Sequence, residues 1–92
     1  MDLGSLLDRV PEGWTAVRYD GRRFGLRRTT RAGGRSASVY AEELGGTTVV
    51  SANVYRTVAG AVLRPCEMPA EAVLAFLEGW RPAAQNSADA SC

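Results

Sequence analysis

The chain has 92 residues and a mass of 9.8 kDa, a length typical of one domain with one modest hydrophobic core. Apolar residues make up 46% of the sequence, which excludes a chain disordered throughout, and the net charge is only +1. All 11 basic residues are Arg, and the sequence has neither Lys nor His. Within one chain this excludes Ser–His and Cys–His catalytic pairs, His-ligated metal sites and the P-loop.

The two cysteines, Cys66 and Cys92, are too few for a Cys₄ zinc site and do not form the pattern of a disulfide scaffold. No apolar stretch approaches the roughly 20 residues that span a bilayer. The N-terminal segment carries Asp2 and Asp8 and lacks the basic region of a signal peptide. We therefore expect a cytoplasmic protein that has no membrane segment, no metal and no other cofactor.

In chain order, the first predicted element is a short helix with one apolar face, formed by Leu3, Leu6, Leu7 and Val10. Pro11 and Gly13 end this helix. The period then changes to that of strands, with turn residues spaced about ten apart. Strands are predicted over residues 14–19, 22–31, 36–44, 47–56 and 61–64, joined by turns at 20–21, 32–35, 45–46 and 57–60.

A second helix is predicted to begin at Pro69, because proline fits the first helical position. Its apolar residues recur at helical spacing, and they are Ala70, Val73, Leu74, Leu77 and Trp80. Gly79 and Pro82 mark its end. Residues 1–82 are therefore expected to form a single α+β domain, and residues 83–92 a disordered polar tail.

The predicted fold is a two-layer α+β sandwich. A curved antiparallel meander of four or five strands carries the N-terminal and C-terminal helices on one face. The residues expected to face the helices are Phe24, Leu26, Ala37, Val39, Ala41, Thr48, Val50, Ala52 and Val54. The opposite face of the sheet is left open.

Arginine and tyrosine residues occupy the alternate strand positions that point to this open face. The candidate binding residues are Arg23, Arg27, Arg31, Tyr40, Asn53 and Tyr55. Residues 9–35 hold eight Arg against Glu12 and Asp20, a net charge of +6, whereas the rest of the chain is at −5. Guanidinium groups bind phosphates and tyrosine rings stack on bases, so single-stranded nucleic acid is one expected partner. The alternatives are a protein partner, a second copy in a homodimer, and a face that is merely solvated.

Cys66 is the one nucleophile for which the sequence offers a mechanism. It follows Arg64 and precedes a helix N-terminus, and both favour a thiolate. Glu67 would serve as the acid or base, so the candidate catalytic set of an enzyme is Cys66, Arg64 and Glu67. The other interpretation is a buried structural cysteine at a strand-to-helix junction.

Two segments carry a resemblance. They are Ala41-Glu42-Glu43-Leu44-Gly45-Gly46, preceded by Tyr40, and Leu63-Arg64-Pro65-Cys66-Glu67-Met68-Pro69, followed by Val73, Phe76 and Leu77. With Asn53 and Tyr55 between them, they resemble a family of small bacterial proteins that often carry the label peptide methionine sulfoxide reductase. The resemblance covers residues 11–82. It draws attention to Glu42, Glu43, Asn53, Tyr55 and Cys66, and a reductase activity would depend on Cys66.

The predicted layout, a curved meander of strands followed by a helix, is also similar to that of the transcriptional-coactivator type of single-stranded DNA binder. The sequence therefore favours a non-catalytic binding or accessory module that uses its open sheet face. The alternative is a thiol-dependent enzyme centred on Cys66. The sequence leaves the ligand, the oligomeric state and the role of the Glu42-Glu43 pair open.

Overall fold

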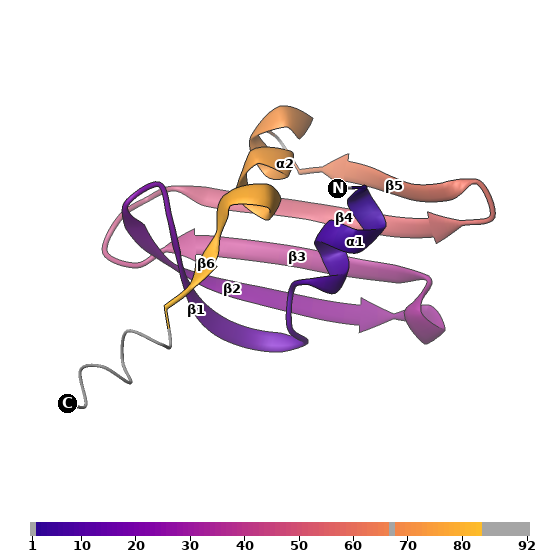
Figure 1. The fold of residues 1–92 in the computed structure, drawn as a ribbon, viewed down its shortest axis with the longest axis horizontal. Coiled ribbons are helices and arrows are strands. Elements are labelled where there is room, and N and C mark those ends of the chain that lie inside the picture. Colours follow the sequence, from indigo (N-terminus) through magenta and orange to yellow (C-terminus); the bar gives the residue numbers. More distant parts are fainter. Residues whose placement is uncertain (1, 67, 84–92) are drawn as a thin grey trace.

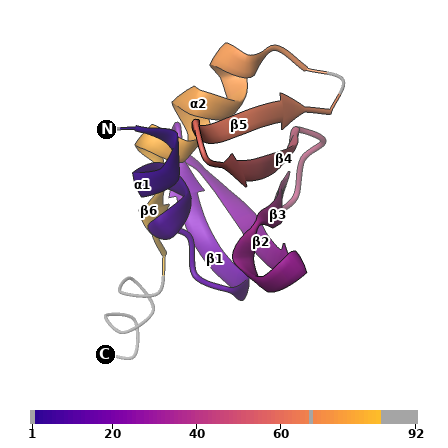
Figure 2. The same ribbon diagram turned by 90° about the vertical axis from the view of Figure 1, so that its right-hand side faces the viewer.

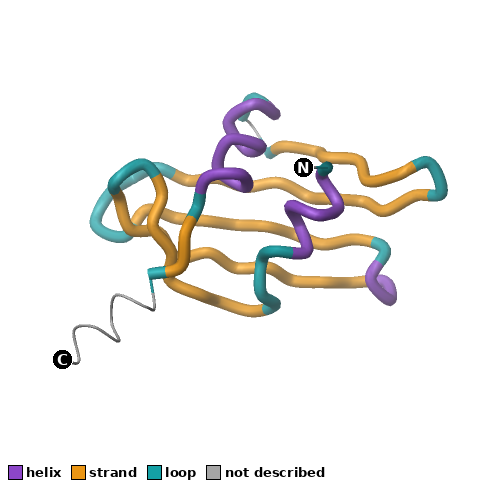
Figure 3. The backbone as a smooth tube through the Cα atoms, viewed as in Figure 1, coloured by secondary structure: helices purple, strands orange, loops and turns teal. Residues whose placement is uncertain are grey.

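A computed structural model of the chain describes residues 2–66 and 68–83. It contains, in chain order, α1 (Leu3–Asp8), β1 (Gly13–Tyr19), β2 (Arg22–Arg31), a 3₁₀ turn (Ala32–Gly34), β3 (Ser36–Glu43), β4 (Val49–Thr57), β5 (Gly60–Pro65), α2 (Ala70–Gly79) and β6 (Arg81–Pro82). The strands form one antiparallel sheet in the order β5-β4-β3-β2-β1-β6 (Figures 1 and 3). The predicted mixture of two helices with an antiparallel meander is thus confirmed.

The predicted number of strands, four or five, is wrong: the described residues form a sheet of six. The additional strand, β6, follows α2 and pairs with Val17 and Arg18 at the free edge of β1. Two residues are too few to show the alternation that identifies a strand in a sequence. Ala83, expected to begin a disordered tail, is instead buried, and its N–H donates to the Ala16 carbonyl (3.1 Å). Residues 84–92 lie outside the described part of the chain.

The hairpin between β1 and β2 turns through Asp20 and Gly21, as the sequence predicts. Both residues have positive φ, 55° and 75° respectively. Two consecutive positive φ values give the turn a twist that matches the right-handed twist of the flanking strands. Asp tolerates this conformation better than most residues and Gly does so without strain. The local sequence therefore fixes the register in which β2 returns beside β1.

Both helices lie on one side of the sheet, which bends around them (Figure 2). The sheet is curved, as predicted, and the predicted two-layer arrangement describes the fold only approximately. The inward residues of β2, β3 and β4 are buried as predicted, except Thr48, which precedes β4 and is exposed. Phe24 of β2 lies edge-on to Phe76 of α2, with ring centroids 5.3 Å apart, and this contact anchors α2 to the sheet.

Two arginines on the helix side bind the carbonyl ends of the helices. Nη1 of Arg28 donates to the Leu7 and Val10 carbonyls, both at 3.0 Å, at the end of α1. Arg9 donates to the Leu77 and Trp80 carbonyls (3.1 and 3.3 Å) at the end of α2. The Leu7 carbonyl also accepts from the Val10 N–H (2.9 Å) and the Trp80 carbonyl from Arg81 Nη1 (2.9 Å). The positive charge of each arginine also opposes the negative end of the helix dipole. The two arginines thereby join helix to sheet and helix to helix.

Replacing Arg28 by Met should lower the free energy of unfolding by about 1–3 kcal/mol, because two carbonyls lose a charged donor while the aliphatic packing is kept. Urea denaturation followed by circular dichroism measures this loss. Arg23→Met, on the exposed side of the same strand, is the matched control and should change stability by no more than about 0.5 kcal/mol. Equal losses in the two variants would contradict the assigned role of Arg28.

Glu12 fastens the loop after α1 to the end of β2. Its carboxylate accepts hydrogen bonds from the hydroxyl (2.6 Å) and the backbone N–H (3.0 Å) of Thr30. These bonds, with a smaller contribution from the charge of Arg28, lower the pKa of Glu12 below its ordinary value of 4.5. The stability that they supply is therefore present above pH 4.5 and is lost as the pH falls through the lowered pKa.

Glu12→Gln should consequently be less stable than the wild type at neutral pH, and the difference should narrow as the pH falls below 4.5. Gln keeps the shape of the side chain and one acceptor oxygen but cannot titrate. Thermal unfolding of both proteins on either side of this pH checks the prediction. A difference that stays constant across the range would show that Glu12 is not the titrating group.

Candidate functional site

The open face of the sheet is defined by strand register, because residues paired across an antiparallel ladder lie on the same face. Three rows of four residues cross this face from the β1 or β2 side to β4 or β5. They are Trp14–Arg27–Tyr40–Ser51, Thr29–Ser38–Asn53–Arg64 and Arg31–Ser36–Tyr55–Val62. The predicted outward direction of Arg23, Arg27 and Arg31 on β2 is confirmed, since all three are exposed and alternate with buried Phe24 and Leu26.

Five arginines of β1, β2 and β5 belong to the open face, where they are exposed: Arg18, Arg23, Arg27, Arg31 and Arg64. Arg81 of β6 pairs in register with Arg18 on the same face, and its Nη1 donates to the Trp80 carbonyl (2.9 Å). The ion pairs found among the described residues all use other arginines, namely Arg22 with Glu43, Arg28 with Glu12 and Arg56 with Asp8. Glu42 is the one acid whose register places it among these five. The face therefore carries an excess positive charge that the described acids do not neutralise.

Polar side chains link one end of this face. Arg31 Nη1 donates to the Ser38 hydroxyl (3.0 Å), which in turn donates to Asn53 Oδ1 (2.9 Å). Two of the predicted binding residues, Arg31 and Asn53, are thus brought together through Ser38. Tyr55 lies one row further along β4, opposite Val62 of β5, and is 43% exposed.

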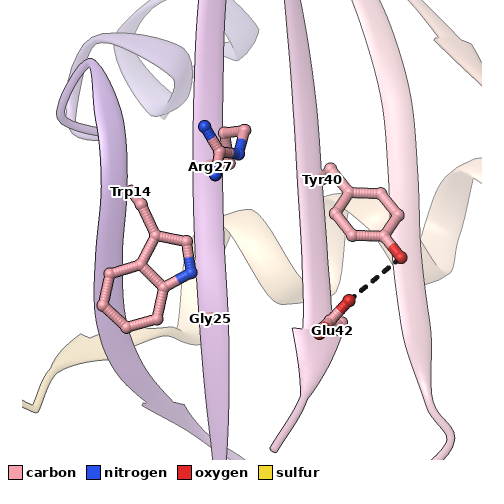
Figure 4. Close-up of a pocket in the computed structure, with 5 residues that line it drawn as sticks. All are labelled: Trp14, Gly25, Arg27, Tyr40 and Glu42. Atoms are coloured by element: carbon pink, nitrogen blue, oxygen red, sulfur yellow. Dashed lines mark hydrogen bonds between the residues drawn. The ribbon is translucent and has the colours of Figure 1, made fainter.

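A pocket of about 170 Å³ opens near the other end of the face. It is lined by Trp14 of β1, Gly25 and Arg27 of β2, and Tyr40 and Glu42 of β3 (Figure 4). Trp14 and Tyr40 remain 56% and 41% exposed, so both rings present surface to a ligand. Of the predicted binding residues, the pocket brings together Arg27 and Tyr40, whereas Arg23 lies beyond it, opposite Arg18.

Gly25 allows the indole of Trp14 to lie against the sheet. A Cβ at Gly25 would stand 2.7 Å from Trp14 Nε1, closer than real Cβ contacts allow. Trp14 is the site residue that the sequence interpretation missed. The face on which Trp14 lies could have been predicted from the sequence. Trp14 and the buried Val17 are three positions apart on one strand, and residues an odd number of positions apart point to opposite faces.

Tyr40 and Glu42 are joined on the rim of the pocket. The Tyr40 hydroxyl donates to Glu42 Oε1 (3.2 Å). Partial desolvation of the phenol, and next its hydrogen bond to Glu42 and the charge of that carboxylate, raise the pKa of Tyr40 above 10.0. Tyr40 is therefore neutral and a hydrogen-bond donor at neutral pH, and it holds the Glu42 carboxylate in place.

Cys66 is exposed, so the interpretation of a buried structural cysteine is wrong. The chain bends out of β5 at this point, and the Cys66 N–H donates to the Ser51 carbonyl (2.9 Å). Arg64 is exposed on β5 opposite Asn53, while Glu67, the proposed acid or base, lies outside the described residues. Across residues 2–66 and 68–83, no three His, Cys, Asp or Glu side chains gather as a metal site would require.

Comparison with protein-family models, with curated proteins and with solved structures finds no match to this chain. None of the helices in the described part of the chain is both long and apolar enough to cross a membrane. The candidate site therefore has to be interpreted from its own chemistry.

Gly25→Ala should displace the Trp14 indole from the pocket wall, since the added methyl takes the space that the indole occupies. The exposed indole can swing outward, so the free energy of unfolding should change by less than about 1 kcal/mol. Acrylamide quenching of tryptophan fluorescence should rise. Trp80, only 4% exposed, gives a nearly constant background.

The matched control is Gly25→Ala in a Trp14→Phe background, where no such change in quenching is expected. A rise in quenching that persists without Trp14 would place the rearrangement elsewhere and contradict this description of the pocket.

Proposed function

We propose that the protein is a non-catalytic binding module that holds single-stranded nucleic acid on the open face of its sheet. The observation that carries this proposal is the group of five exposed arginines without acidic partners among the described residues, set around exposed aromatic rings. Phosphate groups would neutralise the arginines, and guanidinium forks match phosphate oxygens in geometry.

The arrangement of the arginines supports an extended polyanion as the ligand. Arg23, Arg27 and Arg31 stand four residues apart on β2, which is about 13 Å between successive side chains. Arg18 extends the group onto β1 and Arg64 extends it onto β5. A chain of phosphates can contact several of these positions at once, whereas a single small anion can contact only one or two.

The exposed rings favour unpaired bases over a duplex. Trp14, Tyr40 and Tyr55 are 41–56% exposed and belong to the same face as the arginines. Stacking of a base on an aromatic ring needs a base that is free of its partner, and each such contact contributes about 1–3 kcal/mol. Double-stranded nucleic acid would offer phosphates to the arginines but would keep its bases away from the rings.

The competing functions make different use of the same residues. A second copy of the chain would bring arginines against arginines. An acidic protein partner could pair with the arginines and pack on the rings, but a strand of phosphates supplies the negative charges in a regular row. The thiol-dependent enzyme would use Cys66, which is exposed, and Arg64 and Glu67, of which Glu67 lies outside the described residues. The open face itself therefore favours nucleic acid.

The test is fluorescence anisotropy of a labelled oligo(dT) titrated with the protein at several salt concentrations. Each phosphate contact contributes about 0.7 to the slope of log affinity against log salt for a single strand. Arg23→Ala and Arg31→Ala, both outside the pocket, should each lower that slope by about 0.7–1. Arg56→Ala removes the same charge on the helix side, where Arg56 pairs with Asp8 at 2.7 Å, and should leave the slope unchanged.

Three results would contradict the proposal. One is the absence of measurable affinity for oligo(dT) at low salt, and another is affinity that does not depend on salt. The third is an equal effect of Arg23→Ala and Arg56→Ala on the slope, which would mean that net charge alone, and not the open face, governs binding.

A further inference from the structure

We propose that the pocket formed by Trp14, Gly25, Arg27, Tyr40 and Glu42 is a subsite for one guanine base of the bound strand. This inference rests on the proposed function, and it adds base selectivity to a surface whose remaining contacts, with phosphates and by stacking, accept any base. The pocket sets an arginine, Arg27, and a carboxylate, Glu42, around one open space.

Arg27 and Glu42 line the same pocket without forming an ion pair. The salt bridges found within 4.0 Å among the described residues do not include them. Figure 4 shows the two side chains at different ends of the pocket: Glu42 lies beside Gly25, its partner in register, and Arg27 lies further along the strand of Gly25. The Tyr40 hydroxyl donates to Glu42 Oε1 (3.2 Å) and so holds the carboxylate apart from Arg27. Oε2 and the second lone pair of Oε1 remain available to a ligand.

A ligand that satisfies both side chains must offer acceptors to Arg27 and donors to Glu42. A phosphate or carboxylate would be repelled by Glu42, and an ammonium group by Arg27. A flat, neutral group with donors on one edge and acceptors on the next is repelled by neither Glu42 nor Arg27. The walls of the pocket favour such a group, because the exposed rings of Trp14 and Tyr40 provide flat apolar surface.

Guanine is the base with this combination. Its O6 and N7 are adjacent acceptors that an arginine fork can bind with two hydrogen bonds. Its N1–H and 2-amino group are adjacent donors, and a carboxylate has two acceptor oxygens. Adenine places its 6-amino donor where guanine has O6, toward Arg27, and it lacks both donors for Glu42. The volume of about 170 Å³ accommodates one base and not a run of them.

The test compares oligo(dT) strands that carry one central dG, dA or deoxyinosine. Wild-type protein should bind the dG strand about tenfold more tightly than the dA strand, a typical discrimination for a two-bond contact. Deoxyinosine lacks only the 2-amino group and should fall between them. Trp14 fluorescence should be quenched by the dG strand, since the base stacks on the indole, and this quenching should be lost in Trp14→Phe.

Glu42→Gln should reduce the preference for dG over dA to less than about threefold, because the amide offers one acceptor in place of two. Its affinity for the dA strand should not fall, since a negative charge is removed from a phosphate-binding face. Glu43→Gln is the matched control. It removes the same charge from the adjacent residue, which pairs with Arg22 at 3.6 Å, and it should keep the full preference.

The outcomes separate this inference from the proposed function. Salt-dependent binding of all three strands with equal affinity would overturn the guanine subsite and leave the nucleic-acid face standing. A dG preference that survives in Glu42→Gln would also overturn the subsite. Failure to bind any of the strands would overturn both proposals together.

Discussion

The register of β2 between β1 and β3 is the constraint on which the rest of the molecule depends. Phe24 and Leu26 must face inward, because Phe24 packs against Phe76 and both residues belong to the one hydrophobic core. A slip of one position would move every side chain of β2 to the other face. The same requirement that buries Phe24 and Leu26 therefore places Arg23 and Arg27 outward, so core packing determines the charge of the open face.

Much of this could be predicted from the sequence, because the signals are local. The Asp20-Gly21 turn fixes one hairpin, and the alternation of apolar and polar residues along β2 and β4 fixes which side is buried. These two signals are sufficient for an antiparallel sheet covered on one face. The alternation wrongly predicts that Thr48 is buried. It extends to Thr48, but β4 begins only at Val49 and Thr48 is exposed.

The parts that the sequence did not reveal depend on contacts between distant segments. β6 exists because the chain leaving α2 meets the free edge of β1, a matter of where the helix ends rather than of composition. The pocket depends on Gly25 lying beside Trp14 of the neighbouring strand. Taken alone in the sequence, a glycine within a predicted strand indicates only that the strand is weakened there. Periodicity gives the face of each residue, but the order of the strands decides which residues become neighbours.

The arginines show how one residue type takes two roles on the two sides of a sheet. On the helix side, Arg28 and Arg9 donate hydrogen bonds to carbonyls at the ends of the helices, and Arg56 forms an ion pair with Asp8. These three charges therefore stabilise the fold itself. On the open side the fold makes no comparable use of Arg27. A net charge of +1 conceals this division, because the acids lie mainly with the first group. Positive charge that the fold does not use internally is available to a ligand, and the sidedness of the sheet, rather than the total charge, decides where such a ligand can bind.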